Sequence, residues 1–346
     1  MPLQGGGLWS AKCLTKCSVP SSAHQGRSEL GCDVYSLGRL ERNVFVPARP
    51  LPTTADAFPL LDHGKAAGSA QLVRDVAKNR TLMWQVVGEG DCLNGQRNCS
   101  GPQPHRLRSW EGVQTMPRVV WPSAACAASP AAEDCVLLVR CAPEIDQVIT
   151  WRKAVRVPSD GSAASLSIAA AQSPNNLKIH ARLPVGYAGS KDAELRLEGF
   201  AGGPAVTIAL RNHTLTVGPA WRADLRHLPT PQIRENISCT FPSLAEHHVI
   251  EAFLDGSVLE VFSDSGRCAI ITRVYMDHSD HSGAAGSGDA RTITLRAAAG
   301  VELGVYGMRA AYEDWHPQRR APDVDDGAAA ALAAPRANEG PGTSLP

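Results

Sequence analysis

Residue types that bind metals or transfer protons are concentrated in one segment near the C-terminal end of the chain. Asp277, His278, Asp280 and His281 lie close together, and carboxylates with imidazoles are common ligands of divalent metals. Gly and Ser surround them over residues 277–290, which predicts a solvated hairpin loop without a fixed scaffold. The sequence therefore favours a loop over a metal site.

Other groupings have residue types suited to acid–base or nucleophilic chemistry. Glu246 precedes His247 and His248, and we interpret this trio as a polar turn rather than as a general base. Asp255 and Glu260 are two carboxylates in one apolar stretch, and paired carboxylates can serve as general acid and base. No Gly-x-Ser-x-Gly sequence is present to support a Ser-His-Asp triad.

The two carboxylates stand in a stretch that predicts three short strands, over residues 249–254, 257–263 and 267–275. These segments are rich in β-branched and aromatic side chains, and an Asp-Gly pair and an Asp-Ser-Gly run separate them. An Asp-Gly pair between apolar runs indicates a hairpin, because glycine tolerates the positive φ of a tight turn. The physical pattern alone therefore predicts an antiparallel meander.

Six residues of this stretch form a longer motif: Asp255, Ser257, Glu260, Phe262, Arg273 and Tyr275. The motif resembles a signature of the C-terminal β-sandwich module of glycoside hydrolase family 32, which contains invertases, fructan hydrolases and related fructosyltransferases. That module is not catalytic in the family, so the resemblance implies structural roles for these residues.

Upstream segments resemble, in the same order, the last propeller blade of that family and the residues that follow it. They are Tyr35 to Gly38, Leu61-Asp62-His63-Gly64, the strand from Arg80 through Trp84 to Glu89, Trp110, and Pro117-Arg118. The resemblance therefore extends from Tyr35 to Tyr275, and it implies that Pro117 and Arg118 also belong to the structural motif.

The expected fold class is all-β, with a partial five-bladed β-propeller (final blade region) followed by a two-sheet antiparallel β-sandwich. Short extended segments bounded by Gly, Pro or Asn support the sandwich. The expected organisation is an irregular segment 1–31, a propeller portion 32–152, a linker 153–164, a sandwich 165–315 and a disordered tail 316–346.

Composition excludes several classes of partner. Lys+Arg and Asp+Glu both number 34, so the formal net charge is zero, and nothing in the composition indicates binding to nucleic acid or to an anionic membrane. No apolar run approaches the length of a membrane span. Gly and Pro number 31 and 25, which favours many turns and short strands over helices.

Ten Cys and four Asn-x-Ser/Thr sequons favour an oxidising, secretory environment. The candidate N-glycosylation sites are Asn79, Asn98, Asn212 and Asn236. No signal peptide is recognisable at the N-terminus, and the family resemblance implies a secreted or vacuolar location. Spacing does not determine which Cys pair, and it does not match a zinc site, so neither a metal nor a cofactor is predicted.

The family's retaining mechanism needs two carboxyl groups about 5–5.5 Å apart. The resemblance places them in Asn-Asp-Pro-Asn and Glu-Cys motifs, with a third carboxylate in Arg-Asp-Pro, and none of these occurs in this chain. No catalytic residue is therefore assigned. A weakened rim of the fructosyl pocket is expected at Asp62, His63, Trp84 and Glu89.

The sequence leaves three explanations open. The chain is the back portion of a longer fructosidase, or a non-catalytic pseudoenzyme whose sandwich binds carbohydrate or a partner, or an oligomerisation module that pairs with itself or with a full-length relative. The resemblance implies sucrose or a fructan-type carbohydrate as the ligand. An isolated blade would expose strand edges and an apolar face, which favours the first explanation.

Overall fold

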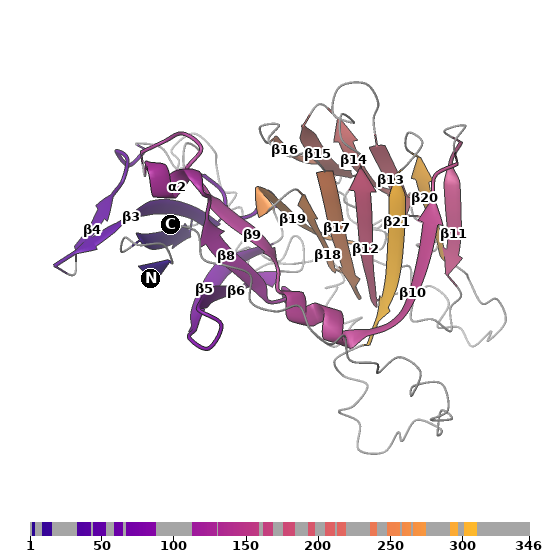
Figure 1. Cartoon of the computed structure of the whole chain (residues 1–346), viewed down its shortest axis with the longest axis horizontal. Coiled ribbons are helices and arrows are strands. Elements are labelled where there is room, and N and C mark those ends of the chain that lie inside the picture. Colours follow the sequence, from indigo (N-terminus) through magenta and orange to yellow (C-terminus); the bar gives the residue numbers. More distant parts are fainter. Residues whose placement is uncertain are drawn as a thin grey trace, which may run out of the picture. The chain divides into compact units, whose positions relative to one another are not determined.

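The computed structural model describes most of the chain between residues 33 and 309 and part of the N-terminal segment. The described ranges are 2–3, 9–15, 33–42, 44–52, 59–64, 67–87, 113–129, 131–158, 162–168, 176–183, 193–197, 205–211, 213–218, 236–240, 248–256, 258–263, 266–274, 291–296 and 301–309. Within them nearly every element is a β-strand, so the all-β prediction is confirmed (Figure 1). No helix in these ranges is long and apolar enough to cross a membrane.

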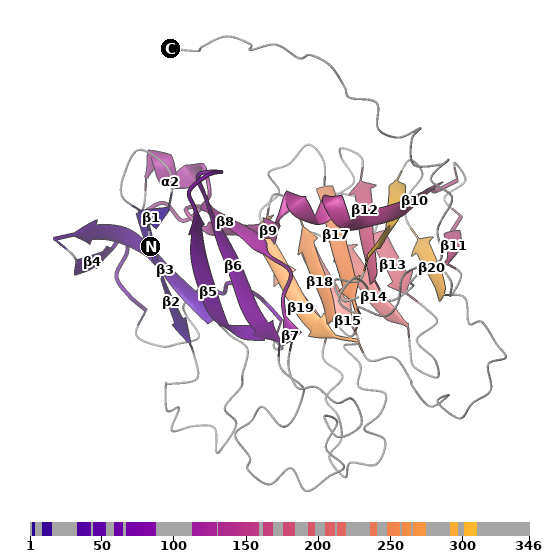
Figure 2. The same ribbon diagram turned by 90° about the horizontal axis from the view of Figure 1, so that it is seen from below.

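The N-terminal half of the chain forms two antiparallel sheets. The first sheet has the order β1-β2-β3-β4, with β1 at Pro2–Leu3, β2 at Trp9–Thr15, β3 at Asp33–Glu41 and β4 at Val44–Pro47. The second sheet has the order β5-β6-β8-β9, with β5 at Ala67–Asp75, β6 at Arg80–Val87, β8 at Arg118–Pro122 and β9 at Leu137–Cys141. A short strand, β7 at Val113–Gln114, pairs with β6 (Figure 2).

The C-terminal half forms two six-stranded antiparallel sheets. The third sheet has the order β10 (Ile149–Arg156), β21 (Glu302–Met308), β12 (Asn176–Leu183), β17 (His248–Asp255), β18 (Val258–Ser263) and β19 (Cys268–Arg273). The fourth sheet has the order β11 (Ala164–Ile168), β20 (Arg291–Arg296), β13 (Ala193–Leu197), β14 (Val206–Arg211), β15 (Thr214–Gly218) and β16 (Ile237–Thr240). The predicted meander is the hairpin series β17-β18-β19.

The third and fourth sheets share one apolar core. Alternate residues of β12, such as Leu177 and Ile179, belong to the same buried cluster as Leu195 of β13. The opposite face of the fourth sheet carries hydroxyl side chains, which bond across strands in the pairs Ser165–Thr294, Thr214–Thr240 and Thr216–Ser238. This alternation of apolar and polar residues is typical of a sheet with one face toward water.

A second apolar core joins the third sheet to the two N-terminal sheets. Tyr35 of β3, Met83 of β6 and Val139 of β9 pack in one buried cluster with Phe253 and Phe262 of the third sheet. The two Phe rings meet edge to face with their centroids 5.9 Å apart. Side chains from distant parts of the sequence therefore bury one another here.

Two short helical elements flank β9. Helix α2 covers Ala125–Ala128, and the 3-10 helix η4 at Pro143–Val148 connects β9 to β10. Glu144 of η4 accepts two hydrogen bonds from Arg80 of β6, at 2.7 and 2.9 Å, while Asp146 accepts one from Lys178 of β12 at 2.6 Å. The hydrogen bonds to Arg80 lower the pKa of Glu144 to about 2. The connector is thus bound by ion pairs on both sides.

The structure corrects two expected segment boundaries. The segment 1–31 was expected to be irregular, but it contains β2, which pairs with β3 along its whole length. Strand β10 crosses the expected boundary at residue 152 and pairs with β21 to Arg156, so residues 153–156 belong to the third sheet rather than to a linker. Strand β10 lies at a sheet edge, and half of its residues are polar, which hides it from a search for apolar runs. The expected tail 316–346 lies outside the described residues.

Two disulfides occur among the described cysteines. Cys239 of β16 is bonded to Cys268 of β19 and so links the fourth sheet to the third, while Cys126 is bonded to Cys135 beside α2. Cys141 is a buried free thiol, and burial raises its pKa. The disulfides agree with the oxidising environment that the sequence predicts.

Removing the disulfide between the two sheets should destabilise the chain more than removing the local one. The bridged residues are separated by 29 positions for Cys239–Cys268 and by 9 for Cys126–Cys135. Loop-closure entropy then predicts losses of about 3.5 and about 2.5 kcal/mol for the respective double Ala variants. Chemical unfolding followed by fluorescence measures both, and equal losses would contradict the entropic explanation.

Candidate functional site

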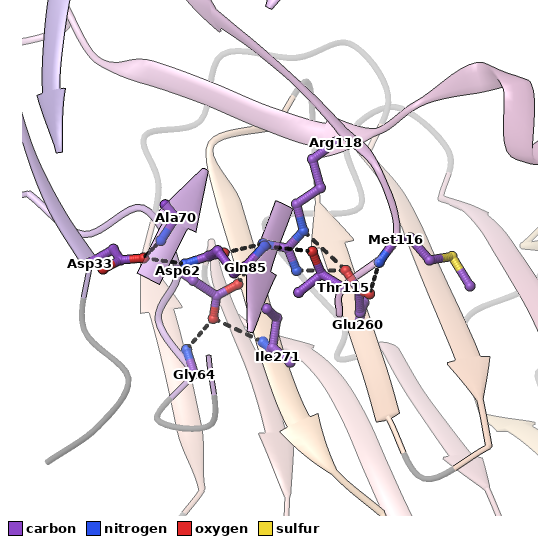
Figure 3. A network of polar contacts seen from close by, with 10 residues as sticks. All are labelled: Asp33, Asp62, Gly64, Ala70, Gln85, Thr115, Met116, Arg118, Glu260 and Ile271. Atoms are coloured by element: carbon purple, nitrogen blue, oxygen red, sulfur yellow. Dashed lines mark hydrogen bonds and ion pairs between the residues drawn. The ribbon is translucent and has the colours of Figure 1, made fainter. Parts of the chain in front are cut away.

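A network of buried charged side chains lies where the second and third sheets meet (Figure 3). Its centre is Arg118, the first residue of β8, whose side chain is 0 % exposed. Arg118 donates from Nε and Nη2 to Oε2 of Glu260, at 3.0 and 2.6 Å. Its Nη1 donates to Oδ2 of Asp62 and to Oε1 of Gln85, both at 3.0 Å.

Backbone amides satisfy the remaining carboxylate oxygens. Oδ1 of Asp62 accepts from the amides of Gly64 and Ile271, at 2.7 and 3.0 Å. Oε1 of Glu260 accepts from the amide of Met116 at 2.7 Å. Every oxygen of both carboxylates therefore accepts a hydrogen bond from the chain itself, which is how buried charges are stabilised in proteins.

Polar side chains extend the network toward the first sheet. Nε2 of Gln85 donates to Oδ2 of Asp33 at 3.1 Å, and the same oxygen accepts from the amide of Ala70 at 2.6 Å. Oγ1 of Thr115 accepts from the amide of Gln85 at 3.1 Å. The network thus joins β3, β5, β6, β8 and β18 through side chains that are far apart in sequence.

The segment 59–64 positions Asp62 by pairing with strands on both sides. The amide of Leu61 donates to the carbonyl of Asp33 at 2.9 Å, and the amide of His63 donates to the carbonyl of Ala269 at 2.8 Å. Gly64 approaches β19 so closely that an added Cβ would lie 1.8 Å from the carbonyl oxygen of Ile271. Glycine is therefore required at position 64 for the segment to lie against the third sheet.

Burial dominates the electrostatics of the two carboxylates. It raises the pKa of Asp62 and of Glu260, and the nearby Arg118 guanidinium acts in the opposite direction. The Arg118 guanidinium also lies 5.1 Å from the ring centroid of Phe262. A carboxylate with 1 or 2 % exposure and no free oxygen is suited to holding strands together rather than to contacting a ligand.

The structure describes three of the four residues that we expected at a pocket rim. Asp62 lies inside the network, and His63 is half-buried beside β19, where burial lowers its pKa. Trp84 lies in the middle of β6 on the sheet face opposite Met83 and is half-exposed. Glu89 lies outside the described residues.

Four residues of the expected structural motif gather around the network. Pro117 precedes Arg118, the amide of neighbouring Met116 bonds Glu260, and Phe262 lies under the guanidinium. Asp255 is exposed at the end of β17, and Arg273 ends β19. Ser257 and Tyr275 lie outside the described residues.

Sequence reasoning missed Asp33, Gln85 and Thr115 as members of the network. A signal for Gln85 was present, because a lone amide in the apolar run of β6 must find buried partners if that strand is internal. Asp33 and Thr115 carry no comparable local signal. Their role depends on which strands become neighbours.

The described sequons lie at the surface. Asn79 is exposed in the turn before β6 with a φ of 50°, and Asn236 is exposed immediately before β16. Asn98, Asn212 and the loop 277–290 with its Asp and His residues lie outside the described residues, so their predicted roles remain predictions.

No protein-family model matches the sequence, and no curated protein matches it. Solved structures match in fold. Fructan 1-exohydrolase IIa from Cichorium intybus has a TM-score of 0.59 at 15 % identity, covering 88 % of this chain and 61 % of that chain. Exo-inulinase from Aspergillus awamori has a TM-score of 0.60 at 13 % identity, covering 90 % and 59 %. A β-fructofuranosidase of family GH32 from Bombyx mori has a TM-score of 0.52 at 14 % identity, covering 81 % and 47 %.

These similarities confirm the sequence resemblance at the level of the fold. The chain has a fold like that of the glycoside hydrolase family 32 fructosidases, and it spans less than two thirds of the length of the enzymes named above. At identities of 13 to 15 % the likeness concerns the fold and not the chemistry.

Breaking the buried network should be strongly destabilising. Arg118→Met would leave Asp62 and Glu260 buried without their cation, which typically costs about 3–5 kcal/mol of unfolding free energy. Urea unfolding measures the loss. Lys78→Met is the matched control, because Lys78 also pairs with a carboxylate, Glu144, but its side chain is 54 % exposed; that change should cost about 0–1 kcal/mol. Similar losses for the two variants would contradict the view that burial makes the ion pairs of Arg118 more important for stability than the exposed pair of Lys78.

Proposed function

We propose that this chain works in fructoside metabolism as the terminal portion of a β-fructofuranosidase-like protein, and that it does not hydrolyse fructosides alone. The observation that carries the proposal is a shared fold over 88 % of this chain with a fructan 1-exohydrolase of which it spans 61 %. The third and fourth sheets then correspond to the β-sandwich, and the second sheet corresponds to the final propeller blade.

The internal geometry supports a structural role for the described portion. Arg118, Asp62 and Glu260 hold the last blade against the sandwich and have no free oxygen for a sugar. The sequence lacks the Asn-Asp-Pro-Asn, Arg-Asp-Pro and Glu-Cys motifs of the family. The chemistry of a retaining glycosidase needs two such carboxyl groups close together. Among the described residues that were expected at the rim, we retain His63 as a neighbour of the fructosyl pocket.

The proposed ligand class is a terminal β-fructofuranosyl sugar, namely sucrose or a fructan. Solved structures with the same fold have been determined with such sugars, including a fructan 1-exohydrolase variant in complex with 1-kestose and a β-fructofuranosidase variant in complex with sucrose. A secreted or vacuolar location fits the two disulfides and the exposed sequons at Asn79 and Asn236.

Release of reducing sugar tests the proposed lack of activity. The purified chain incubated with sucrose or inulin should release no more sugar than a blank, because it lacks the carboxylate motifs. Exo-inulinase from Aspergillus awamori serves as the positive control under the same conditions. Turnover by the chain alone would contradict the proposal.

A thermal-shift titration tests the competing view of a stand-alone carbohydrate-binding module. Sucrose and inulin should leave the unfolding temperature of this chain alone unchanged up to millimolar concentrations. A sugar that bound would stabilise the native state by mass action and raise that temperature. Glucose is the matched control for nonspecific sugar effects. A saturable increase with inulin but not with glucose would favour a binding module instead.

A further inference from the structure

Strands β5 and β6 are joined by a hairpin turn at residues 76–79, and Asn79 is the last residue of that turn (Figure 1). Two hydrogen bonds fix the turn. The amide of Asn79 donates to the carbonyl of Val76 at 3.2 Å, and the amide of Lys78 donates to Oδ1 of Asp75 at 3.2 Å. Asn79 has a φ of 50°, a left-handed conformation that Asn adopts more readily than most residues. The fold alone therefore explains an Asn at position 79.

Arg74 fixes the orientation of the Asn79 amide group. Nη2 of Arg74 donates a hydrogen bond to Oδ1 of Asn79. A guanidinium has donors and no acceptor, so the atom that faces Arg74 must be the oxygen of the amide and not its nitrogen. Nδ2 then lies on the other side of a side chain that is exposed. Nδ2 is the atom to which N-linked oligosaccharides are attached, and attachment there leaves the hydrogen bond to Arg74 intact.

Thr81 completes the sequence Asn79-Arg80-Thr81, and its hydroxyl group has no hydrogen-bond partner among the described residues. Thr81 is 1 % exposed. It lies opposite Val120 of β8 and two positions before Met83, and both of these residues belong to the buried core. A buried hydroxyl without a partner costs free energy, and Val would fill the same space without that cost. The fold explains Asn79, but it does not explain the hydroxyl group of Thr81.

The sequon at Asn236 provides an internal comparison. The hydroxyl groups of its Ser238 and of Thr216 share a hydrogen bond at 3.0 Å, and Ser238 is exposed. A hydroxyl group at position 238 is therefore what a strand facing water would carry with or without a sequon. The oligosaccharyltransferase that modifies Asn requires Ser or Thr two residues later. Recognition by this enzyme accounts for the hydroxyl group of Thr81, which the fold does not use.

We propose that Asn79 carries an N-linked oligosaccharide, which is attached before β6 pairs with β8. Nδ2 of Asn79 attacks the anomeric carbon of an oligosaccharide that is bound to a lipid pyrophosphate. A carbon–nitrogen bond forms, the bond from that carbon to the pyrophosphate oxygen breaks, the lipid pyrophosphate leaves, and Nδ2 loses one proton. In the folded chain Thr81 is buried, so the transferase must act on the chain before it folds. This inference rests on the proposed secretory location and not on the fructoside chemistry.

Translation of the full chain with an added signal peptide, in the presence of microsomes, tests the modification. Asp-N digestion of the chains that the microsomes protect from protease yields the peptide 75–90. N-glycosidase F in heavy-oxygen water then converts a glycosylated Asn into a labelled Asp. The label should appear at position 79, Thr81→Ser should keep it, and Thr81→Val should abolish it, because Val has no hydroxyl group. An unlabelled Asn79 in the unchanged chain would overturn the inference.

The order of modification and folding is tested on chain that has already folded. The full chain is produced without glycosylation in the bacterial periplasm and is incubated with solubilised transferase and lipid-linked oligosaccharide. Labelling at Asn79 should be at least about tenfold slower in the folded chain than in the reduced and unfolded chain, because a buried strand opens rarely in the native state. Equal rates would overturn the proposed order.

Stability separates a role of Thr81 in modification from a role in the fold. In the unglycosylated chain, Thr81→Val should leave the unfolding temperature unchanged or raise it. Thr115→Val is the matched control, because Thr115 is 4 % exposed and its Oγ1 accepts from the amide of Gln85. That change should lower the unfolding temperature by about 2 °C or more. An equal decrease for Thr81→Val would show that its hydroxyl group serves the fold, and it would overturn the inference.

The outcomes distinguish this inference from the proposed function. None of the three measurements needs sugar turnover, so they remain interpretable if the fructoside proposal fails. Absence of the oligosaccharide from the native protein, despite labelling of Asn79 in microsomes, would overturn the secretory location rather than the recognition of this sequon.

Discussion

A fully buried guanidinium is the constraint on which the arrangement of the second and third sheets depends. Arg118 cannot lose its charge, and no water reaches it, so its nitrogens must be bonded by protein oxygens. Those oxygens come from Asp62, Gln85 and Glu260, which belong to three separate segments. Any arrangement that displaces one of these segments would leave a buried charge unpaired. The network therefore selects one packing of these strands among the many that apolar contacts alone would allow.

Backbone contacts reinforce the same junction. Asp62 is held by a segment that hydrogen-bonds to β3 on one side and to β19 on the other, and Gly64 lets that segment approach Ile271. Gly266, with a φ of 92°, brings the turn before β19 against the backbone of Val139 in β9. Side chains larger than hydrogen would separate the strands at both points. Close backbone approach and buried ion pairing are thus two parts of one junction.

The sequence predicted the strands β17 to β19 of the third sheet, because these segments are rich in β-branched and aromatic residues and are bounded by Asp-Gly and Asp-Ser-Gly turns. It also identified Arg118 and Glu260 as structural residues, through the family resemblance rather than through their spacing. It did not show that Arg118 and Glu260 bond each other, since 142 positions separate them. The roles of Asp33 and Asp62 were hidden for the same reason, because buried pairing depends on tertiary neighbours and not on local pattern.

The two C-terminal sheets and the second sheet differ in how completely the described residues bury their apolar side chains. The third and fourth sheets bury their facing apolar residues in each other, and the fourth presents hydroxyl groups on its other side. The second sheet buries one face in a core shared with the third sheet, whereas Val73, Leu82 and Val119 on its other face belong to none of the buried clusters among the described residues. The ion network holds this sheet firmly in place from its covered side.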